Sequence, residues 1–165
     1  MASTLRCAPM LPSKPAVVAA LRTATEITLA GVEASAGAAR DEVGSAETRQ
    51  EGKYDTRATE ASYLARGQAW RVAELRRLAA WYAALRAVDL EYVQLGALVL
   101  LDGEREELIF LAPVGGGAVE VDGRRIRIVS PSSPIGSAMA DLRRGDSFEF
   151  DSPGGRVELE VMDVR

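Results

Sequence analysis

Acidic side chains crowd a short stretch in the first third of the chain. Residues 41–55 contain five carboxylates and only two basic side chains. Carboxylate oxygens are the ligands that Mg²⁺ prefers, and the ion often takes one or two of them from a protein while keeping waters and phosphate oxygens. The stretch could therefore help to hold a Mg²⁺ ion in phosphate chemistry, through Glu47, Glu51 and Asp55.

The geometry of these three acids depends on the element that carries them. They stand four residues apart, so on a helix they line one face. We expect a helix to begin near Ala46 or Thr48, which places the acids where the positive end of the helix dipole stabilises negative charge. Acids at a helix start are also ordinary capping and solvation, and both interpretations stay open at this point.

The composition excludes several kinds of chemistry. The 165 residues include no histidine and a single cysteine, Cys7. Histidine metal sites, Ser-His-Asp triads and imidazole acid–base catalysis are thereby excluded, as are disulfides within the chain and thiolate metal sites. Any chemistry must come from carboxylates, Lys, Arg, Tyr or a metal borrowed from a partner.

Charge is distributed unevenly along the chain. Lys and Arg number 20 against 24 Asp and Glu, for a net charge of −4. Residues 1–88 carry 12 basic and 9 acidic side chains, whereas residues 89–165 carry 8 basic and 15 acidic. Binding to a phosphate backbone calls for a basic face, which these totals do not predict. The acidic second half suits a partner with a basic surface, although it also serves ordinary solubility.

Two long helices are predicted to position the acidic stretch. Residues 1–12 read as a flexible segment, and residues 13–88 as an antiparallel coiled-coil hairpin that begins at Ser13 as N-cap and turns at Gly44 and Ser45. Helices of about 30 residues make a rod about 45 Å long. The expected seam consists of Val18, Leu21, Thr25, Thr28, Val32, Ser35 and Ala39 on the first helix and Leu64, Gln68, Leu75, Leu78, Tyr82 and Leu85 on the second.

Residues 89–165 show the period of β-strands and predict an antiparallel α+β domain with one short helix. An alternating strand is expected from Val93 to Leu101, a hairpin at Asp122 and Gly123, and a closing hairpin at residues 153–155. The glycine run at 115–117 lacks the Lys-Ser/Thr of a phosphate-binding P-loop, so it is interpreted as a strand connector.

The segment Ser130–Gly136, SPSSPIG, is a stiff turn that leads into the short helix. Pro131 and Pro134 restrict its backbone, and Ser132 or Ser133 can cap the helix. A structural turn explains this pattern fully. An exposed turn that presents Ile135 would also make a docking surface.

These features, in this order, resemble the Gre family of bacterial transcript-cleavage factors across about residues 14–165. The resemblance rests on Ser133-Pro134-Ile135-Gly136, on Gly145-Asp146, on Pro153-Gly154-Gly155 with the strand at 158–161, and on the surroundings of Tyr54 and Gly67 in the hairpin. It implies a coiled-coil hairpin joined to an FKBP-like domain.

The resemblance also implies a function. The second domain would dock on bacterial RNA polymerase through Ser133, Pro134 and Ile135, and the hairpin would enter the secondary channel of the polymerase. Glu47, Glu51 and Asp55 at the tip would then assist cleavage of backtracked RNA, with Glu47 and Glu51 sharing a Mg²⁺ ion of the polymerase active centre. The chain would be a cofactor of that enzyme and not an enzyme, with no cofactor of its own and only indirect contact with the nascent RNA.

The tip departs from the family pattern, which leaves an alternative within the same class. Counting back from Tyr54, the two expected acids fall on Glu47 and Gln50, and Lys53 replaces the acid that precedes the tyrosine. Glu51 could substitute for Gln50 if the loop shifts by one residue. A Gre-like regulator or inhibitor that occupies the channel without cleavage is therefore the alternative function.

Two functions of other classes are more distant. An FKBP-type prolyl isomerase needs an aromatic-lined pocket, and residues 91–165 contain one tyrosine and three phenylalanines. A dimerising coiled-coil adaptor needs sustained Leu or Ile at the seam, which is instead rich in alanine and threonine. We therefore expect a monomer. The first dozen residues do not resemble a signal peptide, and no run approaches the roughly 18 apolar residues that span a bilayer, so a cytoplasmic location without membrane contact is expected.

Overall fold

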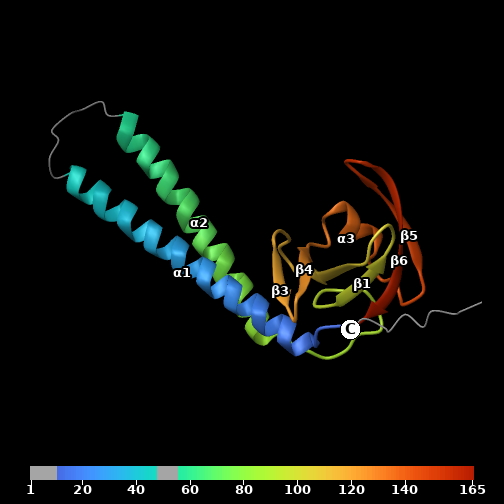
Figure 1. The fold of residues 1–165 in the computed structure, drawn as a ribbon. Helices are drawn as coiled ribbons and strands as arrows, with labels where there is room; N and C mark the ends of the chain where they lie inside the picture. Colours follow the sequence, from blue (N-terminus) through green and yellow to red (C-terminus); the bar gives the residue numbers. More distant parts are fainter. Residues whose placement is uncertain (1–10, 48–55) are drawn as a thin grey trace, which may run out of the picture. The chain divides into compact units, whose positions relative to one another are not determined.

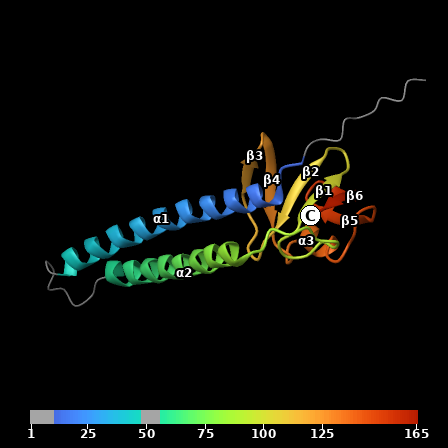
Figure 2. The same ribbon diagram turned by 90° about the horizontal axis from the view of Figure 1, so that it is seen from below.

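The computed structural model describes residues 11–47 and 56–165, apart from the side chains of residues 39–47, 56–58 and 61. Two long helices come first, α1 (Lys14–Glu47) and α2 (Thr56–Ala84), and they run antiparallel and side by side (Figures 1 and 2). A sheet with one short helix follows. The chain divides into two compact units, residues 21–85 and residues 86–165 together with the start of α1 up to Ala20. The predicted fold class is confirmed.

The two ends of α1 compare differently with the sequence prediction. Ser13 caps the start as expected, because its hydroxyl oxygen accepts a hydrogen bond from the backbone N–H of Ala16 at 3.4 Å. At the other end α1 continues through Gly44 and Ser45 to Glu47, where the sequence predicted a turn. One glycine costs a helix about 1 kcal/mol relative to alanine, and the alanine-rich sequence around it tolerates that cost.

The buried face of the hairpin differs from the predicted seam. On α1, Val18, Leu21 and Thr25 are buried as expected, but Thr28 and Ser35 are exposed, and Ala36 is buried instead. The stripe drifts because an α-helix has 3.6 residues per turn and a fixed 3.5-residue spacing does not follow one face for long. The inward-facing positions of α1 are therefore Val18, Leu21, Thr25, Leu29, Val32 and Ala36.

On α2 the prediction of Leu64 as a seam residue is wrong, since 62% of this side chain is exposed. Leu75 and Tyr82 are buried as expected. A row of less exposed residues on α2 recurs at alternating steps of three and four. It includes two alanines and Val72, which are not in the predicted seam. These positions are Ala65, Gln68, Val72, Leu75, Ala79 and Tyr82.

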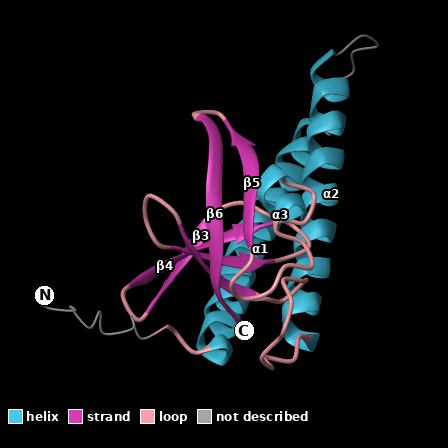
Figure 3. Cartoon of the chain, turned by 90° about the vertical axis from the view of Figure 1, so that its right-hand side faces the viewer, coloured by secondary structure: helices cyan, strands magenta, loops and turns pink. Residues whose placement is uncertain are grey.

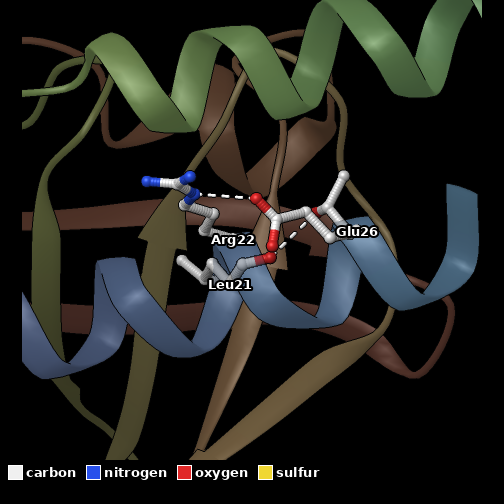
Figure 4. Close-up of polar contacts among 4 residues, drawn as sticks. Leu21, Arg22 and Glu26 are labelled. Carbon is white, nitrogen blue, oxygen red and sulfur yellow. Dashed lines mark hydrogen bonds and ion pairs between the residues drawn. The ribbon is translucent and has the colours of Figure 1, made fainter.

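Exposed ion pairs lie on the surface of the hairpin. Arg76 of α2 reaches across to Glu33 of α1, with its Nη2 atom 2.6 Å from the carboxylate. Within α1, Arg22 pairs with Glu26 at 2.8 Å, one turn further along (Figure 4). Exposed pairs of this kind contribute about 0–1 kcal/mol each, so they add little to the stability of the hairpin.

Part of α1 is a candidate membrane span by length and composition alone. The stretch Lys14–Ala38 is long and apolar enough by length and composition, which the sequence prediction did not anticipate. Core helices of soluble proteins often have the same length and composition, so this is weak evidence for a membrane span. The Glu33–Arg76 ion pair places charges on this stretch and on its neighbour.

A buried lysine ties the start of α1 to the segment after α2. Only 3% of the surface of Lys14 is exposed, and its ammonium group donates a hydrogen bond to the backbone carbonyl of Val88 at 2.5 Å. Burial lowers the pKa of Lys14, and the nearby carboxylate of Asp89 partly opposes this shift. The hydrogen bond offsets part of the cost of burying a charged group.

Tyr82 offers a direct test of the hairpin packing. Burial raises the pKa of Tyr82 from 10.0 to about 12, and its ring meets that of Trp81 edge to face, 5.1 Å between centroids. Because the folded state disfavours the phenolate, this contribution to stability is complete below about pH 10 and is lost as the pH rises to about 12. Ultraviolet titration should show one phenolate that forms late, and Tyr82→Phe should remove that step. Four tyrosines that all ionise near pH 10 while the helices persist would contradict this packing.

The sheet of the second unit has six strands in the order β3-β4-β2-β1-β6-β5. Figure 3 shows β5 and β6 side by side at one edge of it. All neighbouring strands are antiparallel except β2 and β4, which are parallel, whereas the sequence predicted an antiparallel sheet. The difference arises because the β3–β4 hairpin folds back so that β4, not β3, lies beside β2. The strands are β1 (Leu98–Asp102), β2 (Glu107–Leu111), β3 (Ala118–Val121), β4 (Arg124–Val129), β5 (Ser147–Ser152) and β6 (Gly155–Val164).

β1 starts five residues later than predicted. Residues 94–97 form a turn closed by a hydrogen bond from the N–H of Ala97 to the carbonyl of Gln94, at 2.9 Å. Gly96 has φ +86°, a conformation that side-chain-bearing residues rarely adopt, so the expected alternating strand cannot run through it. Val93 instead pairs with Leu142, its N–H donating to the carbonyl of Leu142 at 2.9 Å.

The central strands are buried on both faces. One face carries Val99, Leu101, Ile109 and Leu111, which pack in one cluster with Met139 after α3 (Pro134–Ala138). The other face carries residues that are equally buried, so β1 reads as a continuous apolar run and not as an alternation. These residues are Leu98, Leu100, Leu108, Phe110 and Ile126.

Candidate functional site

The Ser-Pro turn is organised around Ser133. Its backbone is extended, and its hydroxyl accepts a hydrogen bond from the N–H of Gly136 at 3.1 Å while donating to the carbonyl of Ser130 at 2.7 Å. Ser133 is thus the N-cap of α3, and Pro134 follows at the first helical position, where its missing N–H is not needed. The sequence prediction of a serine-capped short helix is confirmed.

Gly136 allows this turn to close tightly. A Cβ atom at position 136 would lie 2.1 Å from the carbonyl oxygen of Ser130, a contact that no side chain can make. The neighbouring Ile135 has 6% of its surface exposed and packs in the core cluster. The sequence hypothesis placed Ile135 on an exposed turn, but its side chain anchors the turn to the core. Pro131, Ser132 and Pro134 are the exposed members.

The glycine-rich loop lies against the same turn. The N–H of Gly116 donates to the carbonyl of Ile128 at 2.9 Å, and the N–H of Ile128 donates to the carbonyl of Gly117 at 3.1 Å. These bonds continue the pairing of β3 with β4 into the two residues that precede the start of β3. A Cβ atom at position 115 would lie 2.6 Å from the backbone nitrogen of Ser130, so Gly115 permits the close approach of the two segments.

A cavity of about 450 Å³ opens between these two segments and β4. We call it the glycine–serine pocket. Its lining combines backbone, two guanidinium groups, two hydroxyls and aliphatic side chains, and it includes two of the three residues predicted to meet a partner, Ser133 and Ile135. The residues are Gly115, Gly116, Gly117, Arg125, Arg127, Ile128, Val129, Ser130, Ser133 and Ile135.

Only part of the predicted acidic site lies within the described residues. Glu47 is the last residue of α1, whereas α2 begins only at Thr56, so Glu47 does not belong to the second helix as the sequence predicted. The side chain of Glu47 and all of Glu51 and Asp55 lie outside the described residues. Within the described part of the chain, no three carboxylate or other metal-binding side chains come together to hold an ion.

The glycine–serine pocket could not have been found from the sequence. Arg125 and Arg127 are ten and twelve residues from Gly115 along the chain, and only the pairing of β4 with both the loop and β2 brings them to the same opening. Arg127 forms an ion pair with Glu107 of β2, 2.8 Å between Nε and the carboxylate. No aromatic side chain lines the pocket, unlike the pocket that a prolyl isomerase needs.

Comparisons with known proteins bear on the second unit most directly. Residues 93–165 match the family model described as transcription elongation factor, GreA/GreB, C-terminal. Curated proteins give no match. Among solved structures, the transcription factor Gfh1 is 19% identical, with a TM-score of 0.39, and covers 88% of this chain and 94% of its own.

Two further structures are similar. Gfh1 of Thermus thermophilus, a GreA factor homolog, is 20% identical over 88% of this chain and 95% of its own, with a TM-score of 0.37. A GreA/GreB elongation factor from Nitrosomonas europaea is 25% identical over 55% of this chain and 78% of its own, with a TM-score of 0.34. All three TM-scores lie below 0.5, so these likenesses add nothing to the match of the family model. Residues 93–165 therefore match the C-terminal domain of the GreA/GreB transcription elongation factors, the family that the sequence resembles.

Proposed function

We propose that this protein docks on bacterial RNA polymerase through its C-terminal domain and inserts the α1–α2 hairpin into the secondary channel. There it would stimulate cleavage of backtracked RNA and the restart of elongation. The observation that carries the proposal is the GreA/GreB C-terminal domain at residues 93–165, preceded in the same chain by two long antiparallel helices. Helix α1 runs without a break from Lys14 to Glu47, so at 1.5 Å per residue it is about 50 Å long.

The carboxylates at the far end of the hairpin are the proposed chemical contribution. Glu47 and Glu51 would offer oxygen ligands, the donor type that suits Mg²⁺, and Asp55 would add negative charge beside them. A Mg²⁺ ion shared with the polymerase active centre would activate water and stabilise charge on the scissile phosphate. The protein would contribute ligands and position, and the polymerase would remain the enzyme.

Docking is proposed to involve the Ser-Pro turn. Ser133 and Ile135 hold the turn rigid, by the cap of α3 and by core packing, and leave Pro134 exposed on its surface. A turn that is already ordered loses little conformational entropy when it binds, which favours affinity. The acidic balance of residues 89–165 suits a basic surface on the polymerase.

A channel-binding regulator without cleavage activity is the second candidate. One observation favours it: Lys53 and Gln50 stand where the family pattern has acids. Both candidates need the same docking and the same hairpin. They differ only in what the tip does to the RNA.

One experiment in two steps tests the proposal. The full chain is first captured with core RNA polymerase and then added to a backtracked elongation complex, with appearance of the short 3′ RNA fragment as the measurement. Binding together with accelerated cleavage is the expected result. Binding with no cleavage would leave only the regulator, and absence of binding would remove both functions. The protein is expected in the bacterial cytoplasm, as a monomer by sedimentation.

A further inference from the structure

The two arginines of the glycine–serine pocket differ in their electrostatic state. Arg127 is engaged by Glu107, with its Nε atom 2.8 Å and its Nη2 atom 3.1 Å from the two carboxylate oxygens. Arg125 lies two residues earlier on the same strand and forms no ion pair with any described residue. Among the described residues, the pocket thus has one guanidinium group in an ion pair and one, that of Arg125, without an ion pair, although Glu120 stands opposite Arg125 in the β3–β4 register.

The shape of the pocket is set before any ligand arrives. Gly115 lets the loop approach the backbone of Ser130, and Gly136 lets the turn close on the carbonyl of the same residue. Both segments thus approach the backbone of Ser130 closely. Ile128 and Ile135 add apolar surface, so the opening combines aliphatic lining with the guanidinium group of Arg125, which forms no ion pair with a described residue.

The charge state of the two arginines indicates which class of ligand fits the pocket. A nucleoside polyphosphate brings several negative charges, and here it would meet the guanidinium group of Arg125 in a domain with 15 acidic and 8 basic side chains. A single carboxylate matches that guanidinium group and can bind it through two hydrogen bonds. The aliphatic lining suits an apolar residue next to that carboxylate, and about 450 Å³ is enough for a few side chains.

We infer that the glycine–serine pocket receives an Asp or Glu side chain, flanked by an apolar residue, from a segment of RNA polymerase, and that Arg125 is its anchor. This inference rests on the proposed docking and adds a residue that neither the family resemblance nor the sequence assigned to the interface. The surrounding body is acidic, so Arg125 provides a local attraction that would specify where the polymerase segment sits.

The test compares two arginine variants of the full chain in binding to core polymerase. Arg125→Ala removes this guanidinium group from the pocket, and Arg144→Ala removes another exposed arginine of the same domain that forms no ion pair with a described residue. Truncating a charge-assisted contact is expected to weaken binding about tenfold or more in Arg125→Ala. Arg144→Ala should bind like the unmodified protein, and Arg125→Lys should fall between, because it keeps the charge but not the paired geometry.

The outcomes separate this inference from the proposed function. If the unmodified chain does not bind polymerase, the docking itself fails. If it binds and both alanine variants bind equally well, docking stands and the role of Arg125 is overturned. Amide shifts at Gly116 and Gly117 on addition of a nucleoside triphosphate alone, without effect of Arg125→Ala on polymerase binding, would also overturn it and assign the pocket to a small anion.

Discussion

Replacing Glu47 or Glu51 with alanine is expected to reduce stimulated RNA cleavage about 100-fold while leaving the affinity for polymerase unchanged. The reason is that a carboxylate that would hold the Mg²⁺ ion contributes to the rate of cleavage and not to docking, which the proposal assigns to the C-terminal domain. Removal of one such preorganised group typically costs a factor of about 100–1,000 in rate. The measurement is the rate of fragment release from a backtracked complex at saturating factor, with affinity measured separately.

Glu60→Ala is the matched control for these variants. Glu60 is an exposed acid near the start of α2 that forms no ion pair with a described residue, so its loss changes the net charge of the hairpin by the same amount. This variant should stimulate cleavage by the polymerase as strongly as the unmodified protein does. Equal loss in all three variants would mean that general charge, and not the two named carboxylates, drives cleavage. If the unmodified protein binds polymerase but does not stimulate RNA cleavage, the channel-binding regulator would be the correct function.

Gly136→Ala is expected to damage docking and domain stability together. The added Cβ would lie 2.1 Å from the carbonyl oxygen of Ser130, and since that atom is backbone, the whole turn must move. Forcing extra atoms into such a site typically costs about 1–3 kcal/mol. The shift would also pull Ser133 from its capping geometry, so polymerase affinity should fall well over tenfold. Hydrogen exchange of the sheet amides in the full chain measures the stability, because both tryptophans lie in α2 and do not report on this domain.

Gly154→Ala separates a local clash from a general intolerance of alanine. At position 154 the nearest atom to an added Cβ is the hydroxyl oxygen of Ser152 at 3.7 Å, which is ordinary van der Waals contact. This variant should keep both the stability and the affinity of the unmodified protein. If Gly136→Ala behaves in the same way as Gly154→Ala, the turn is not rigid, and its proposed role as a preformed docking element is wrong.

Features that depend on neighbouring residues could be predicted from the sequence. The Ser13 cap, the Ser133 cap of α3 and the hairpin at Asp122 and Gly123 are all present, because each depends on hydrogen bonds and backbone preferences within a few residues. The two long helices follow from an alanine-rich sequence in which Pro15, in the first turn of α1, is the only proline of the two ranges. The family resemblance could be read for the same reason, since it rests on short motifs in a fixed order.

Features that depend on distant residues could not be predicted. The place of β4 beside β2 is a choice among strand partners, and the local sequence of either strand is compatible with an antiparallel neighbour. On α2, Leu64 is exposed although it is apolar, and small residues lie on the covered face instead. The path of the partner helix decides which face of α2 is covered.

The sequence by itself determined the elements and their order, because helix propensity, caps and turn motifs act over a few residues. Only the tertiary structure decided that Ile135 is a core anchor and that Arg125, Ser130 and the glycine loop share one opening. The physical reason is that burial and charge compensation are properties of surroundings, and these surroundings come from segments that meet only when the sheet has formed.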